Sequence, residues 1–177
     1  SLMMDCAMGG SPGHLRPFHR TSLALHVANA ILVYLLLYSI FRKPLPAALT
    51  ALIFGVHPMT VETIPWIGER KTVLATFFAL GSLIFYVRYV RSARPHGKPS
   101  SLARAAYVAC GLFYILSLMS KPTTTALPLV MLLMDFWPLD RLSRRSIIEK
   151  TPFLVISTVS AIITYLSQAL TAVVQVP

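Results

Sequence analysis

Acidic residues are scarce in this chain: its 177 residues include six Asp and Glu against 16 Lys and Arg, a formal net charge of +10 at pH 7. Charged residues make up only 12% of the sequence, whereas apolar residues make up 55% and the mean hydropathy is +0.67. Because so few charges cannot cover a water-soluble domain of this size, lipid is the expected solvent for most of the chain. The basic residues lie at the ends of apolar runs and form no stripe on one amphipathic element, so no nucleic-acid partner is expected.

Cysteine is also rare, and nucleotide-binding and zinc-protease motifs are missing. Cys6 and Cys110 lie far apart, and Cys110 is in the middle of an apolar run, so neither a disulfide framework nor a metal site is expected. The sequence contains no glycine-rich nucleotide loop and no HExxH zinc motif. Function must therefore be sought in residues placed by membrane helices.

Long apolar runs are abundant in this sequence. At roughly 20 apolar residues for each crossing, they predict an all-α, polytopic transmembrane bundle of about six segments. The expected segments are residues 18–41, 45–56, 72–90, 102–119, 123–137 and 152–174, after an outer-face loop over residues 1–17. The second segment is short and is bounded by Pro46 and Pro58.

The basic residues divide unequally between the two sides of this topology. Eleven of the 16 fall on one side: Arg42, Lys43, Arg88, Arg91, Arg94, Lys98, Arg104, Arg141, Arg144, Arg145 and Lys150. Short cytoplasmic loops are enriched in Lys and Arg, so this side is expected inside and both ends of the chain outside. Because residues 1–17 contain no apolar signal, we expect an additional upstream helix and interpret the chain as an internal piece of a larger membrane protein.

The first expected segment has a polar face. His19, Ser22, His26 and Asn29 follow one another at helical spacing, whereas the opposite face is apolar. Polar groups in hydrocarbon are costly without partners, so this face is predicted to point into the bundle. It could form interhelical hydrogen bonds or line a polar cavity.

The outer loops contain the densest set of chemically capable side chains. Arg70 and Lys71 are cations on the side where the insertion bias disfavours them, and Lys121 lies in a second outer loop. An Arg fork and Lys ammonium groups suit phosphate, so with His57 and Glu62 they predict a lipid-phosphate site at headgroup depth. Trp66 and Glu69 fit an interfacial role at least as well as a ligand role.

Asp135 closes the fifth expected segment on the inner side. It has Arg141 within reach, so a structural role at the helix end is favoured over a functional one. Trp137 is interpreted as an interfacial belt residue.

Three motifs together resemble a known family. They are residues 57–74, residues 120–122 (Ser-Lys-Pro) and residues 133–139 (Leu-Met-Asp-Phe-Trp-Pro-Leu). They look like the membrane portion of bacterial polytopic proteins with C-terminal tetratricopeptide repeats. Those proteins are similar to the eukaryotic transmembrane and tetratricopeptide-repeat O-mannosyltransferases of the GT-C glycosyltransferase superfamily. Residues 1–5, with His19, His26 and Asn29, also resemble the family pattern, and the resemblance extends over most of the chain up to Leu139.

The resemblance implies a GT-C-like transferase in a bacterial cytoplasmic membrane that uses a polyprenyl-phosphate-linked sugar on the outer, periplasmic face. The family's catalytic acid would lie upstream of Ser1 and its repeat domain downstream of Pro177. Asp5 matches a later position and is not expected to be the base, which leaves Glu62 as a weak candidate.

The sequence leaves two other classes of protein open. The chain could be a non-catalytic scaffold that contacts membrane lipids and other transmembrane subunits. A transporter is a third interpretation, although no internal repeat or pair of broken helices is evident.

Overall fold

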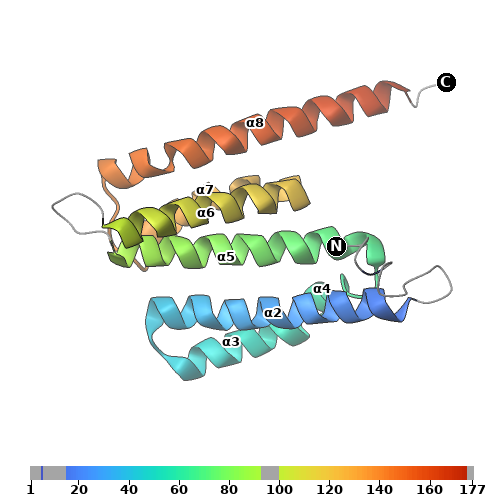
Figure 1. The fold of residues 1–177 in the computed structure, drawn as a ribbon, viewed down its shortest axis with the longest axis horizontal. Helices are drawn as coiled ribbons and strands as arrows, with labels where there is room; N and C mark the ends of the chain where they lie inside the picture. The colour runs from blue at the N-terminus through green and yellow to red at the C-terminus, as the bar shows by residue number, and fades with distance from the viewer. Residues whose placement is uncertain (1–4, 6–14, 93–99, 175–177) are drawn as a thin grey trace.

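The computed structural model describes residue 5, residues 15–92 and residues 100–174, and this part of the chain is helical with no strand (Figure 1). The elements are α2 (Arg16–Phe41), α3 (Pro44–Val56), α4 (Pro58–Val61), the 3₁₀ helix η1 (Ile67–Glu69), α5 (Arg70–Ser92), α6 (Ser101–Ser120), the 3₁₀ helix η2 (Pro122–Ala126), α7 (Leu127–Phe136) and α8 (Arg144–Val174). The all-α prediction is confirmed.

Four helices are long and apolar enough to cross a membrane: Arg16–Phe41, Arg70–Ser92, Ser101–Ser120 and Arg144–Leu170. The second and fifth predicted segments correspond to shorter apolar helices, Pro44–Val56 and Pro122–Phe136. The structure therefore supports an integral membrane protein with four spans by length and composition. Six crossings and a GT-C-like arrangement stay predictions.

The last helix begins earlier than predicted. The predicted membrane segment starts at Pro152, whereas α8 begins at Arg144 and contains Pro152 in its interior. Ser143 caps the first turn: its hydroxyl accepts the Ser146 amide at 3.2 Å, and the Ser146 hydroxyl accepts the Ser143 amide at 2.9 Å. This reciprocal cap satisfies amides that the helix itself leaves unpaired.

The long helices lie side by side, and the second half of α8 extends past the end of α6 (Figure 1). The bundle thus has two ends, which we call the Lys121 end and the basic end. At the Lys121 end, α2 and α5 begin and α6 stops. At the basic end, α2 and α5 stop and α6 and α8 begin.

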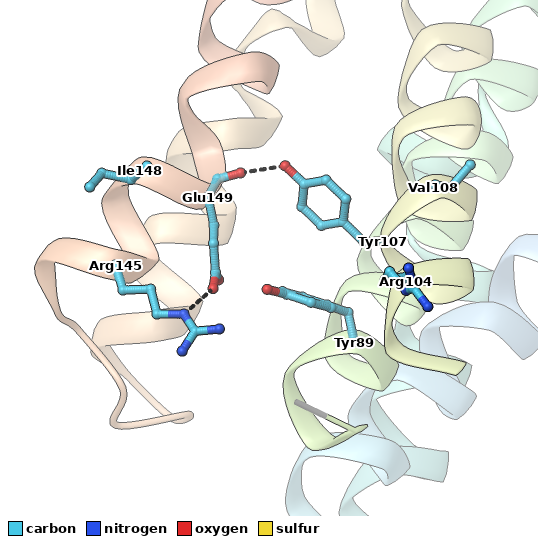
Figure 2. A pocket seen from close by; sticks show the side chains of 7 residues that line it. All are labelled: Tyr89, Arg104, Tyr107, Val108, Arg145, Ile148 and Glu149. Atoms are coloured by element: carbon cyan, nitrogen blue, oxygen red, sulfur yellow. Dashed lines mark hydrogen bonds and ion pairs between the residues drawn. The ribbon is translucent and has the colours of Figure 1, made fainter. Parts of the chain in front are cut away.

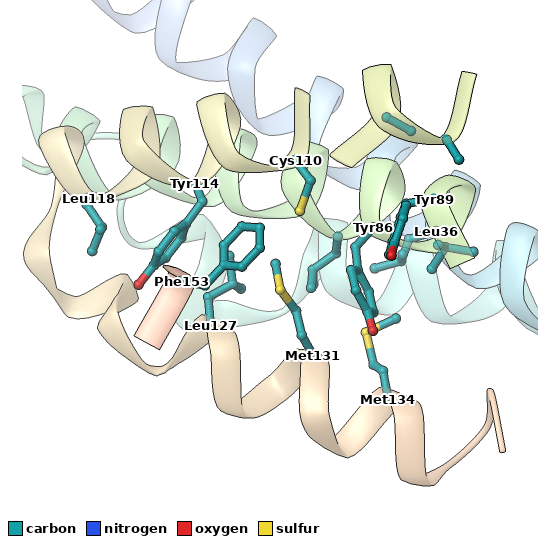
Figure 3. Close-up of a cluster of buried hydrophobic side chains, with 14 residues drawn as sticks. Leu36, Tyr86, Tyr89, Cys110, Tyr114, Leu118, Leu127, Met131, Met134 and Phe153 are labelled. Carbon is teal, nitrogen blue, oxygen red and sulfur yellow. The ribbon is translucent and has the colours of Figure 1, made fainter. Parts of the chain in front are cut away.

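The core lies where α5, α6, α7 and α8 meet (Figure 3). Tyr86, Cys110, Tyr114 and Met131 are almost completely buried there, and Phe153 of α8 closes the cluster. Outside this cluster α5 and α6 pack closely because Gly81 has no side chain: a Cβ at this position would overlap the ring of Phe113.

Candidate functional site

A pocket of about 490 Å³ lies at the Lys121 end, between α8 and the α6–η2 junction. We call it the Lys121 pocket; it is lined by Lys71, Ser120, Lys121, Pro122, Thr123, Thr125, Ala161, Thr164, Tyr165 and Gln168. Two of the five predicted lipid-phosphate residues, Lys71 and Lys121, therefore line one pocket although 50 residues separate them. Hydroxyl groups and one amide provide further donors in the lining.

Lys121 is oriented by contacts with the start of α5. Its ammonium group donates to the Thr72 hydroxyl at 2.7 Å and lies 3.4 Å from a carboxylate oxygen of Glu69. The Thr72 hydroxyl in turn donates to the same Glu69 oxygen at 2.6 Å. These bonds, first from Thr72 and then from Lys121, lower the pKa of Glu69 below its usual value, so its negative charge is present at neutral pH. The Glu69 carboxylate partly offsets the charge of Lys121.

Lys71 has a different environment from its neighbour Arg70. Its side chain is exposed and makes no ion pair within the described part of the chain. The Lys71 charge is therefore available to an anion in the pocket.

Arg70 is not available in this way, and the prediction that it joins the two lysines is wrong. Its side chain is 3% exposed and forms a buried ion pair with Asp5. The same guanidinium donates to the Phe18 carbonyl oxygen and, at 3.3 Å, to the Ser22 hydroxyl. The anionic partner of Arg70 is thus Asp5 of the same chain. In the sequence, Asp5 is notable only because it matches the family pattern.

His57 and Glu62 do not line the Lys121 pocket. His57 lies between α3 and α4, where its Nδ1 accepts the Met59 amide at 3.3 Å and so caps the short helix. Glu62 ends α4 and is exposed. Pro65 lies between the end of α4 and η1, so the 57–71 loop is broken into two short helices and does not align its side chains on one continuous helix.

The polar face of α2 points into the bundle, as its spacing predicts. His26 Nε2 lies 2.9 Å from the Gly55 carbonyl oxygen of α3, and the Asn29 amide donates to the Val73 carbonyl oxygen of α5 at 2.9 Å. Ser22, His26 and Asn29 are buried, whereas His19 is half-buried. For His26 and Asn29, the observed contacts are interhelical hydrogen bonds, the first of the two roles considered for this face.

A second group of buried charges lies toward the basic end. The Asp135 carboxylate pairs with Lys150 of α8 and accepts the Tyr86 hydroxyl of α5, and Lys150 also donates to that hydroxyl at 2.6 Å. Asp135 and Lys150 are each 1% exposed or less. These contacts agree with the structural role favoured for Asp135. Arg141 lies nearby but donates its side chain to Glu149 at 2.6 Å, and only its backbone amide reaches the Asp135 carbonyl oxygen. Lys150 was counted among the basic loop residues, but it lies within α8 and is buried.

A pocket of about 620 Å³ lies beside this group, between α6 and the first turns of α8 (Figure 2). The Tyr107 hydroxyl donates to the Glu149 carbonyl oxygen at 2.7 Å, and Arg145 pairs with the Glu149 carboxylate at 3.3 Å. The Tyr107 contact connects α8 to α6, whereas Arg145 and Glu149 both belong to α8. Arg141 shares the Glu149 carboxylate, and Arg104 also lines the pocket, so one carboxylate does not balance the cations there.

Comparisons with protein families, curated proteins and solved structures give no match for this chain. Within the described ranges, no group of three or more His, Cys, Asp or Glu side chains could hold a metal ion. The chemistry of this chain is therefore inferred from the geometry of its two ends.

Proposed function

We propose that this chain is the lipid-phosphate-binding part of a GT-C-like membrane glycosyltransferase, in which Lys71 and Lys121 bind the phosphate of a polyprenyl-phosphate-linked sugar. The observation that supports the proposal is that these two cations, from separate segments, line one pocket with several hydroxyl groups. Charge-assisted contacts to phosphate are among the stronger hydrogen bonds in proteins. The pocket volume also falls within the range usual for small-ligand sites.

The position of the pocket suits a ligand with a lipid tail. It lies at one end of helices long enough to span a membrane, and exposed apolar residues of α8 such as Ile162 and Leu166 lie close to it along the helix. A phosphate at headgroup depth can therefore contact the lysines while its chain follows the lipid-facing surface of α8. Bulk membrane lipids would occupy the rest of that surface.

The catalytic step would need an acidic side chain that is not already paired. Of the three acidic residues at the Lys121 end, Asp5 pairs with Arg70 and Glu69 with Lys121. Glu62 is exposed and makes no ion pair within the described residues, so it stays the candidate base in this chain. His57, beside the same loop, is proposed to help shape the sugar site.

Binding of a polyprenyl phosphate to purified protein in nanodiscs tests the proposal. Replacing Lys71 or Lys121 by Ala removes a charge-assisted contact and should weaken binding by about tenfold. Lys43→Ala at the basic end is the matched control and should leave the affinity unchanged. Equal affinity in all three variants would contradict the proposal.

A non-catalytic scaffold is the second candidate, and one observation favours it. The part of α8 beyond Pro152 exposes Val155, Val159, Ile162, Ile163, Leu166 and Leu170. A helix with so much apolar surface could pack against another transmembrane subunit. Crosslinking of α8 to a second polypeptide in native membranes, with no polyprenyl-phosphate binding, would favour this function over the transferase.

A further inference from the structure

A groove of about 560 Å³ runs along the outside of the bundle between α2 and α5, with Phe113 of α6 at one edge. Its two ends differ in chemistry. Toward mid-bundle it is walled by Leu32, Leu35, Phe77 and Phe113, and at the basic end by Arg42, Arg88 and Arg91. The groove is thus apolar along its length and cationic at one end. The apolar part suits an acyl chain, and the cationic end suits an anionic headgroup.

Within the part of the chain that the structure describes, the three arginines have no negative partner. All six Asp and Glu of the chain are described residues, and none lines the groove or lies within 4.0 Å of these guanidinium groups. By contrast, Arg141, Arg145 and Lys150 at the same end each pair with a carboxylate. The charge at the mouth of the groove is therefore left for an external anion.

Local contacts keep two of these guanidinium groups near the mouth. Arg91 donates to the Ile40 carbonyl oxygen at 3.3 Å, which connects the end of α5 to the end of α2. The Arg42 guanidinium lies 6.0 Å from the centre of the Tyr38 ring. Arg88 precedes Arg91 by three residues, so both lie on one face of α5.

We infer that this groove binds one anionic phospholipid, whose phosphate lies among Arg42, Arg88 and Arg91 and whose acyl chain follows Leu35 and Phe77. Basic pockets between transmembrane helices recognise anionic headgroups in this way, and guanidinium forks match phosphate oxygens. Arginines that only extend to the interface would not need to converge from two helices on one groove. The site lies at the end of the bundle opposite the Lys121 pocket and does not depend on the proposed transferase function.

Native mass spectrometry of the detergent-purified protein, titrated with dioleoyl phosphatidylglycerol or dioleoyl phosphatidylcholine, tests this site. The protein should bind phosphatidylglycerol more tightly, and Arg42→Gln with Arg91→Gln should reduce that affinity by about tenfold or more. Arg104→Gln with Arg144→Gln removes the same charge at the same end, outside the groove, and should leave the affinity unchanged. Leu35→Trp, which keeps all three arginines, should also weaken binding by obstructing the acyl chain.

Three results would overturn the inference. Equal losses in the two arginine pairs would indicate general charge attraction at this end. Equal affinity for the two lipids would show that the groove does not recognise the negative charge of the headgroup. Displacement of the lipid by an equal concentration of sn-glycerol 3-phosphate, with no effect of Leu35→Trp, would indicate a site for soluble phosphates.

Discussion

Arg70 and Lys71 are neighbours with opposite environments. Consecutive residues of an α-helix point about 100° apart, so at the start of α5 one side chain faces α2 and the other faces outward. Arg70 is buried against Phe18, Ser22 and Asp5, whereas Lys71 is exposed at the Lys121 pocket. One basic dipeptide therefore provides both a structural ion pair and a cation available to a ligand.

Replacing Arg70 by Gln should destabilise the protein strongly. The substitution leaves the Asp5 carboxylate buried without its cation, which typically costs about 3–5 kcal/mol. Adding Asp5→Asn should restore much of the loss, and Lys71→Gln should change stability little. Thermal unfolding in detergent measures all three. A single Arg70→Gln variant as stable as the unmodified protein would show that the pair does not stabilise the fold.

Replacing Glu69 by Gln should strengthen polyprenyl-phosphate binding by about two- to fivefold at pH 7, because it removes a negative charge beside Lys121. The pKa of Glu69 lies below its usual 4.5 owing to Thr72 and Lys121. Its carboxylate is thus charged above that range and neutral only as the pH falls through the lowered pKa. The difference between the two proteins should therefore be present at neutral pH and disappear at the acid end. Weaker binding by Glu69→Gln would instead make Glu69 part of the ligand contact.

For single residues, the sequence predicts which way a side chain faces when helical spacing alone decides it. It does not predict ion pairs between residues that are far apart in the sequence. The facing of Ser22, His26 and Asn29 is a consequence of helical spacing alone. The partners of Arg70 and Asp135 are not, because each partner lies on another part of the chain. The scarcity of acidic residues was a usable signal, because each of the few carboxylates in an apolar chain must meet a cation when it is buried.

Among the helices, α8 is attached to the bundle mainly through its first half. Its first turns contact the bundle through Lys150 and Glu149, and Ser157 donates to the Thr125 carbonyl oxygen of η2. Beyond these contacts the helix exposes its apolar residues. The buried pair of Asp135 and Lys150 is thus a main connection between α7 and α8.

Replacing Lys150 by Met should reduce stability by about 3–5 kcal/mol, since Asp135 would keep its buried charge without a cation. The double change Asp135→Asn with Lys150→Met should regain part of this loss. Arg144→Met, an exposed change at the first residue of α8, is the control and should have little effect. If Lys150→Met and Arg144→Met unfold at the same temperature, the pair is not a connection that the fold needs.

Element positions were predictable where apolar period and length were decisive. The four long helices fall at predicted segments, whereas the first turns of α8 precede the predicted apolar segment because they are polar and begin at the Ser143 cap. The short helices α3 and α7 show the limit of this reasoning. Their apolar composition alone does not decide whether they cross a membrane.

The whole molecule has two chemically distinct ends. The basic end contains most of the described Lys and Arg residues and the arginine-lined groove, and the Lys121 end contains Lys71, Lys121 and the loop with Glu62. If the long helices span the membrane, these ends lie in opposite headgroup layers. The proposed polyprenyl-phosphate site and the inferred phospholipid groove each require their end of the bundle to lie in a headgroup layer.

Cysteine accessibility at the two ends tests this arrangement most directly. Gly68→Cys at the Lys121 end and Ser143→Cys at the basic end are both exposed positions, introduced singly after Cys6 and Cys110 have been replaced by Ser. In intact cells a membrane-impermeant maleimide should label Gly68→Cys, and it should label Ser143→Cys only after the membrane is opened, because basic loops stay inside. Labelling of both positions from the same side would contradict a bundle that spans the membrane with its two ends in opposite layers.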